Sequence, residues 1–340
     1  MLKSLQKAFK VKEVRDRLLY TFMMLVVIRI GCCLPIPGVD PSYLHDFFSN
    51  LQNSGMGFFN AITGGSFSSM SIFALSITPY ITSSIIMQLL TIAIPKLEEM
   101  QKDGEDGRKK IAEYTRYLTV GLALFESCAM AVGLGGKGLL LEDHRNIWGY
   151  LTVVAAMTAG SALLMWIGER ITDNGVGNGI SIVLLINIVS GTPQDMMTLY
   201  ERFMAGRSVA VATVSGIIVL AIIVAIVVFV LVLNDAERRI PVQYSKKMQG
   251  RRMIGGQSTY IPLKVNTANV IPVIFASSIM SMPVMIAQFF HVDYSTIGGK
   301  ILLALSSSNW FKPEAPAYSI GMLVYIILVV LFAYFYTSIT

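Results

Sequence analysis

The chain has little charge and none of the motifs on which most enzymes rely. Asp, Glu, Lys and Arg make up only 14% of its 340 residues, whereas soluble domains carry about a quarter. Its three histidines, His45, His144 and His291, fall in separate predicted loops. It contains no His-Glu-x-x-His, Gly-x-Ser-x-Gly or phosphate-binding Gly-x4-Gly-Lys-Ser/Thr motif. These absences argue against a soluble enzyme and a metalloprotein, and we expect no metal and no cofactor.

What the chain has instead is long apolar segments. It is 54% hydrophobic, with a mean hydropathy of +0.62. A helix needs roughly 20 apolar residues to cross about 30 Å of hydrocarbon. Windows of that length predict eight spans, at residues 18–35, 72–94, 117–134, 148–168, 180–200, 209–233, 270–290 and 318–338. The sequence therefore predicts an all-α polytopic membrane protein.

The basic residues predict an orientation for these spans. Lys and Arg gather in the amino-terminal segment, residues 1–17, and in the loops after the second and sixth spans. The positive-inside rule places these parts in the cytoplasm. Residues 1–17 form a basic, amphipathic stretch without a cleavage site, so we expect the first span to stay in the mature protein.

Two connections are too long to be simple turns. Residues 38–71 contain a glycine-rich, half-apolar stretch at 56–65 that is too short to span, and a re-entrant or capping helix fits it better. Residues 234–268 alternate basic residues with β-branched or aromatic ones, which predicts a protruding hairpin with a basic tip. The alternative for this loop is a solvated topology signal with no further role.

Ionisable residues within the spans are few, which counts against a secondary transporter. Arg29 lies near the outer end of the first span, where its long side chain can reach the interface. Glu126 lies deeper in the third span. It is either a hydrogen-bonded packing residue or a functional group, and the sequence alone leaves both open.

Bulky aliphatic residues recur at helical spacing in three spans. Ile77 and Ile81 are four apart, as are Ile180 and Leu184, and such pairs lie on one helix face. Ile274 stands at the start of the seventh span. In most membrane proteins such residues face lipid or pack in the core, so spacing alone does not make them a pore lining. The Gly-Val-Gly-Asn-Gly sequence at 175–179 precedes a span rather than following a strand, which predicts a helix start and not a nucleotide loop.

Several strings, in order along the chain, resemble the SecY family of protein-conducting channels. They are Arg-Ile-Gly at 29–31, Pro-Ile-Pro-Gly at 35–38, Ser-Ile-Phe-Ala-Leu at 71–75, Pro-Tyr-Ile-Thr-Ser-Ser-Ile-Ile at 79–86, Gln-Leu-Leu at 88–90, Tyr-Thr-Arg-Tyr at 114–117, Gly-Val-Gly-Asn-Gly-Ile-Ser at 175–181, Gly-Arg-Arg at 250–252, Gln-Ser-Thr at 257–259, Pro-Leu-Lys-Val-Asn at 262–266 and Val-Ile-Pro-Val-Ile-Phe-Ala-Ser-Ser at 270–278. The resemblance implies two inverted halves around an hourglass pore, here residues 18–200 and 201–340. The family has ten spans, so we expect a truncated sequence that lacks the ninth and tenth.

The resemblance also implies roles for four sets of residues. The pore ring, a constriction of bulky aliphatic side chains, corresponds to Ile77, Ile81, Ile180, Leu184 and Ile274, with leucine at 184 where isoleucine is common. The plug that blocks the resting channel corresponds to residues 56–71, including Phe58, Phe59, Asn60, Ile62, Gly64 and Gly65. The lateral gate between the second and seventh spans corresponds to Thr82, Ser83, Gln88, Glu126, Ser277 and Ser278. The partner-binding residues of the basic loops correspond to Lys109, Lys110, Lys246, Lys247, Arg251 and Arg252.

The function implied by the resemblance is a channel in the bacterial inner membrane that translocates unfolded secretory proteins and releases membrane-protein segments laterally. Its implied partners are the SecE and SecG subunits, the SecA motor ATPase, the ribosome, signal-peptide-bearing polypeptides, membrane lipid, YidC and SecD/SecF. Because the chain has no nucleotide motif of its own, energy would come from a partner. The alternatives are a secondary transporter of a small solute and, more remotely, a membrane scaffold or enzyme without a recognisable motif.

Overall fold

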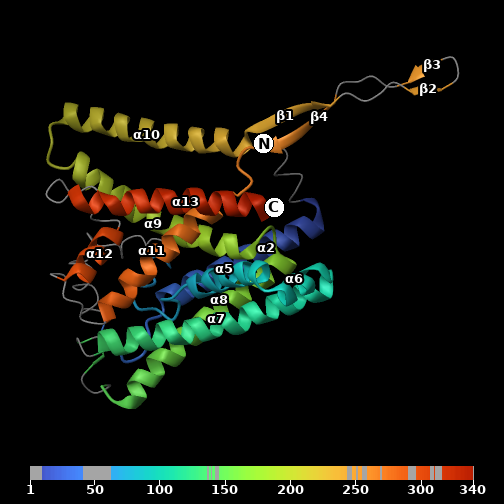
Figure 1. Ribbon diagram of the computed structural model, residues 1–340. Helices are drawn as coiled ribbons and strands as arrows, with labels where there is room; N and C mark the ends of the chain where they lie inside the picture. The colour runs from blue at the N-terminus through green and yellow to red at the C-terminus, as the bar shows by residue number, and fades with distance from the viewer. Residues whose placement is uncertain are drawn as a thin grey trace. The chain divides into compact units, whose positions relative to one another are not determined.

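The computed structural model describes residues 10–40, 63–135, 138, 140–141, 145–242, 247–249, 252–254, 259–268, 270–289, 296–306, 310 and 316–339. Helices dominate, and two short antiparallel ribbons accompany them (Figure 1). The chain divides into two compact units, the first made of Met1–Pro193 with Ser277–Ile326 and the second of Gln194–Ala276 with Ile327–Thr340. The inverted halves inferred from the sequence stay a prediction.

A helix lies at each of the eight predicted spans. They are α2 (Lys12–Cys33), α5 (Thr78–Ala93), α7 (Glu105–Leu134), α8 (Ile147–Asn174), α9 (Gly179–Phe203), α10 (Val209–Asp235), α11 (Ile271–Phe289) and α13 (Ile320–Ile339). Among the described residues, four helices are long and apolar enough to cross a membrane by themselves: Ile147–Asn174, Gly179–Phe203, Val209–Asp235 and Pro316–Ser338. A multi-pass helical membrane protein is thereby confirmed, while the orientation of the spans stays a prediction.

The second span differs from the prediction at both ends. The chain forms turns over residues 72–77, and α5 begins only at Thr78, with a proline in its first turn. Proline suits this position because its missing N–H is not needed there. At the other end the helix breaks before Pro95, and α6 (Pro95–Lys102) continues at an angle of 101° to α5. If the pair is one span, it is a bent one.

The core of the first unit is built around α8, which packs against α2, α5 and α7. Glycines allow the closest approaches. A Cβ on Gly160 would collide with the carbonyl oxygen of Ile72, and one on Gly179 would collide with the carbonyl oxygen of Gly168. Small residues at such points let membrane helices pack backbone to backbone. The turns that precede α5 are therefore held directly against α8.

The Gly-Val-Gly-Asn-Gly sequence at 175–179 is a helix start, as predicted. Helix α8 ends at Asn174, and Gly177 adopts a φ of +73°, a conformation that glycine reaches without a steric penalty. The side-chain oxygen of Asn178 then accepts hydrogen bonds from the backbone N–H groups of Ile180 (3.0 Å) and Ser181 (3.3 Å). These contacts satisfy amides in the first turn of α9 that have no partner within the helix.

The second unit contains α10, which has the highest mean hydropathy of the candidate spans, and the predicted hairpin. Helix α10 has no buried residue and a mean hydropathy of 3.6. Beyond it, β1 (Glu237–Val242) pairs antiparallel with β4 (Thr259–Lys264), and β2 (Lys247–Gln249) pairs with β3 (Arg252–Ile254). The antiparallel pairing expected of a hairpin is thus present between Glu237 and Lys264, while Gly250 and Arg251 of the predicted basic tip lie outside the described residues. Within the same unit, Phe275 and Phe332 meet edge to face, with ring centroids 5.6 Å apart.

Besides α6, the described residues contain one more helix that lies outside the predicted spans. The loop before the last span contains α12 (Ile297–Leu305), followed by a 3-10 turn at Pro316–Ser319. Trp310 joins them, because its indole N–H donates to the carbonyl oxygen of Ala304 (2.9 Å) while its own carbonyl accepts from the hydroxyl of Ser319 (2.7 Å). The apolar run in residues 301–305 was a signal for this helix, but it is too short to register as a span.

Candidate functional site

Four of the five predicted pore-ring residues come together in the first unit. Ile77 is fully buried, and Ile81, Ile180 and Leu184 pack against the same apolar cluster. Gly168 of α8 shows how closely two of them approach: a Cβ built there would lie 2.8 Å from the Cδ1 atom of Ile180 and 3.6 Å from that of Ile77. Ile77 before α5 and Ile180 in the first turn of α9 therefore both pack over Gly168 of α8, where no side chain intervenes.

The fifth ring residue, Ile274, lies in the second unit, near the start of α11. Its side chain is partly buried. Its position relative to the other four is not defined by either unit alone, so the complete ring stays a prediction.

The turn before Ile77 has an unusual conformation. Ser76 adopts a φ of +52°, in the left-handed region that residues with a Cβ disfavour. Asn187 of α9 donates a hydrogen bond from Nδ2 to the hydroxyl of Ser76 (3.0 Å). The hydroxyl of Ser161 on α8 donates to the carbonyl oxygen of Ser76 (3.3 Å). All three residues are buried. This cluster was not predicted from the sequence, although one amide within an apolar span was a visible signal.

The described end of the predicted plug lies against α9. Gly64 and Gly65 have φ values of +66° and +80°. A Cβ on Gly64 would lie 2.8 Å from the backbone oxygen of Asn187 and 2.9 Å from the hydroxyl of Ser190. The segment entering the turns before α5 thus contacts α9 closely. The other plug residues, Phe58, Phe59, Asn60 and Ile62, lie outside the described part of the chain.

The predicted gate residues of α5 differ in their surroundings. The Ser83 hydroxyl is buried and donates to the carbonyl oxygen of Pro79 (2.7 Å), and Thr82 donates likewise to Thr78 (3.1 Å). Gln88 is exposed. Hydrogen bonds within one helix satisfy hydroxyl groups at a membrane-buried surface without requiring a partner helix. These side chains are therefore compatible with a contact between helices that can open.

On the other helices, Glu126 and Ser277 are buried and Ser278 is partly buried. Ser277 lies 3.4 Å from the Tyr325 hydroxyl, as measured between the two oxygens. Oε2 of Glu126 has no hydrogen-bond partner among the described residues. A buried carboxyl group is costly in hydrocarbon, which marks Glu126 as a functional candidate. The gate itself stays a prediction.

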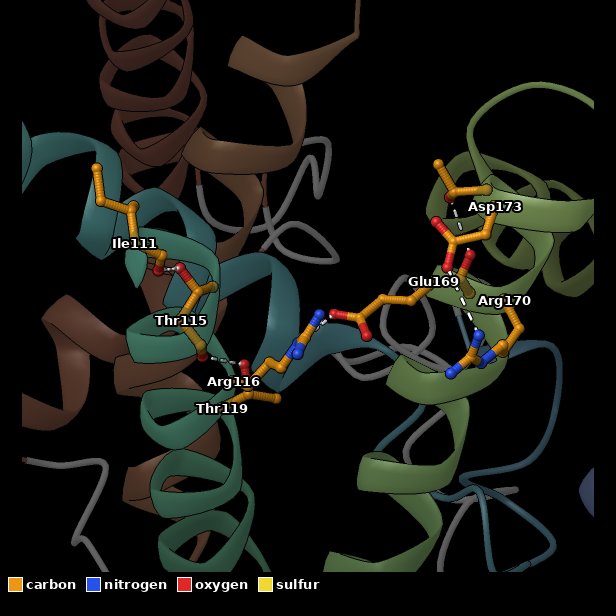
Figure 2. A network of polar contacts seen from close by, with 9 residues as sticks. Ile111, Thr115, Arg116, Thr119, Glu169, Arg170 and Asp173 are labelled. Carbon is orange, nitrogen blue, oxygen red and sulfur yellow. Dashed lines mark hydrogen bonds and ion pairs between the residues drawn. The ribbon is translucent and has the colours of Figure 1, made fainter. Parts of the chain in front are cut away.

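An ion pair joins α7 to α8 (Figure 2). Nε of Arg116 donates to Oε1 of Glu169 at 2.7 Å. Beside it, the hydroxyls of Thr115 and Thr119 bond to carbonyls of their own helix, and Arg170 lies 3.8 Å from Asp173. Both members of the Arg116 pair are partly exposed, and such pairs contribute about 0–1 kcal/mol. The pair therefore adds little to stability.

The predicted partner-binding residues are described in part. Lys109 and Lys110 are exposed in the first turns of α7. Lys247 lies on β2 and Arg252 on β3, and only their backbone is described. Lys246 and Arg251 lie outside the described residues. Between the paired strands β1 and β4, the guanidinium of Arg239 lies 4.7 Å from the ring centroid of Tyr260, a distance typical of a cation–π contact. Docking to a partner stays a prediction.

The residues that the structure describes contain no group of His, Cys, Asp or Glu side chains able to hold a metal ion. Together, the long apolar helices and the buried aliphatic cluster are those of a polytopic helical membrane protein. Comparison with known proteins specifies the family. The family model described as SecY matches residues 71–340. The chain belongs to the SecY family.

Individual relatives agree with this assignment. The chain is 44% identical to "Protein translocase subunit SecY" of Streptomyces scabiei over 352 residues, covering all of this chain and 77% of the relative. It is 40% identical to the protein of the same name from Halalkalibacterium halodurans, covering all of this chain and 76% of that one. The chain thus spans about three quarters of the length of these relatives.

The fold agrees as well. A solved structure described as that of a protein conducting channel superimposes with a TM-score of 0.59 at 20% identity, covering 94% of this chain and 71% of that one. None of these comparisons favours a secondary transporter.

Proposed function

We propose that this SecY-family chain forms a channel through which unfolded polypeptides cross the bacterial inner membrane and from which apolar segments leave laterally into lipid. The observation that supports the proposal is the aliphatic cluster in which Ile77, Ile81, Ile180 and Leu184 gather. Branched aliphatic side chains can exclude water and ions by shape and dewetting. They can also spread around a passing chain, because no specific hydrogen bond has to be broken.

The partner requirements follow from chemistry. A chain with no nucleotide-binding motif needs an external source of energy, so we infer that it works with the SecA motor or the ribosome, together with the SecE and SecG subunits. The exposed Lys109 and Lys110 and the hairpin of residues 234–268 present basic side chains for this docking. Basic side chains bind ribosomal RNA phosphates or acidic protein surfaces by long-range, salt-sensitive attraction. YidC and SecD/SecF fit the same assembly as accessory partners.

Translocation into vesicles tests the function. The chain, assembled with its partner subunits in proteoliposomes, should protect a signal-peptide-bearing substrate from added protease when the motor and ATP are present. A matched substrate without its signal peptide should stay accessible. Uptake of a small solute driven by a proton or sodium gradient, with no protection of the polypeptide, would replace this proposal with the transporter alternative.

A further inference from the structure

Ser76 is a buried residue of the turns that precede α5, and it comes directly before Ile77. Its φ of +52° is a conformation that glycine adopts freely and serine does not. The N–H of Ser76 donates to the carbonyl oxygen of Phe73 (2.8 Å), and this hydrogen bond closes the turn. Because Ile77 is the next residue and the N-cap of α5, the conformation of Ser76 sets the direction in which the Ile77 side chain enters the cluster.

Side chains from two other helices hold this conformation. Nδ2 of Asn187 donates to the Ser76 hydroxyl (3.0 Å), and Ser161 donates to the Ser76 carbonyl oxygen (3.3 Å). The exposures of the three residues are 0% for Ser76 and 1% for each of the other two. Hydrogen bonds formed in such dry surroundings are stronger than in water. A conformation that is disfavoured locally persists when its surroundings specify it in this way.

Asn187 has two further features that point to this role. Its Oδ1 atom has no hydrogen-bond partner in the described part of the chain, so the amide group is held there through its Nδ2 bond to Ser76. The backbone of the same residue is the surface against which Gly64 packs. One turn of α9 therefore contacts both the end of the plug segment and the turn that precedes the ring.

We propose that Asn187 is a positioning residue of the channel seal, which holds Ser76 in the left-handed conformation and so orients Ile77 into the constriction. The proposal rests on the channel function proposed above. It assigns no role in binding substrate to Asn187. The amide acts on the seal through Ser76, and it is required because residue 76 carries a side chain.

If Asn187 holds Ser76 in this way, a second substitution at Ser76 should rescue the loss of Asn187. Asn187→Leu keeps a similar volume but removes the donor, so Ser76 relaxes toward an ordinary conformation, Ile77 turns, and ion leak per inserted channel rises several-fold. Ser76→Gly alone leaks no more than the wild type, because glycine takes the required φ without support. The double variant Ser76→Gly with Asn187→Leu returns to the wild-type leak. Ile188→Leu, a conservative change at an exposed neighbour, is the control and leaves the leak unchanged.

The experiment is ion flux through the channel complex in proteoliposomes, normalised to inserted protein, with polypeptide translocation measured on the same vesicles. A general structural role for Asn187 would leave the double variant as leaky as Asn187→Leu, and that result would overturn the proposal. An unchanged leak in Asn187→Leu would overturn it too. If Asn187→Leu fails to insert, recovery of insertion in the double variant supports the proposal and failure of both contradicts it. Loss of translocation in the wild type would instead count against the channel function.

Discussion

Replacing three helix glycines by alanine tests the packing that supports the constriction. In a helix interior, alanine is favoured over glycine by about 0.5–1 kcal/mol, and overpacking a filled site costs about 1–3 kcal/mol. A Cβ on Gly160 would meet the backbone of Ile72, which cannot rotate away. The cost should therefore lie near the upper end, and Gly160→Ala should lower stability by about 2 kcal/mol net.

The other two glycines provide graded comparisons. At Gly168 the nearest atom to a built Cβ is the Cδ1 of Ile180 at 2.8 Å, the far end of a flexible side chain, so Gly168→Ala should be close to neutral in stability. Nothing lies within 4 Å of a Cβ on Gly121. Gly121→Ala should therefore raise stability by up to about 1 kcal/mol.

The assay is thermal unfolding of each purified variant in the same detergent, with translocation measured in proteoliposomes. The unfolding temperature should be highest for Gly121→Ala, intermediate for Gly168→Ala and lowest for Gly160→Ala. Gly160→Ala should also lose translocation, because the turns before α5 shift. If Gly160→Ala unfolds at the same temperature as Gly121→Ala, α8 is not packed against residue 72 as described, and the support proposed for Ile77 is wrong.

Three further outcomes are expected. Arg251→Glu with Arg252→Glu should weaken binding of SecA and ribosomes at low salt while leaving membrane insertion intact, because charge at a hairpin tip acts mainly on association; equal affinities at low salt would reduce the loop to a topology signal. Arg116→Gln, which removes the ion pair to α8, should lower the free energy of unfolding by no more than about 1 kcal/mol, and a loss above 3 kcal/mol in thermal or denaturant unfolding would show that the pair is a buried one. Cysteines at Ser83 and Ser278, with the native cysteines replaced, should crosslink across the predicted gate and stop translocation, and normal translocation by a verified crosslinked channel would refute that assignment.

The sequence was sufficient for the helices because crossing a membrane requires long apolar segments whatever their neighbours are. Each predicted span coincides with a helix, and the apolar α10 was the plainest of them. The start of α5 was predicted six residues too early, at residue 72 rather than 78. The apolar run continues through these residues, but they form turns in which Ser76 is left-handed and hydrogen-bonded to side chains of α8 and α9. Contacts between residues so far apart in the sequence leave no local pattern.

The site shows a similar division. The four-residue spacing of Ile77 and Ile81 indicated a shared helix face but not what it faces, and the resemblance to SecY supplied the role. The structure then placed four of the ring residues in one cluster. Asn187 could not be assigned from the sequence, because one amide in an apolar span is compatible with many packing roles. Its partner lies 111 positions away in the sequence, a distance that no local pattern reports.

The central claim is that the aliphatic cluster seals a pore, and ion conductance of the assembled channel in a planar bilayer tests it most directly. Ile77→Asn and Ile180→Asn are compared with Leu185→Asn, which places the same polar group at an exposed position of α9. If the cluster is a dewetted seal, the two ring variants should raise resting conductance per inserted channel, because water and ions enter a neck that has become polar. Leu185→Asn should leave conductance unchanged and lower only the amount inserted. Equal conductance in the wild type, both ring variants and the control, with insertion verified, would contradict the account and return these isoleucines to ordinary helix packing.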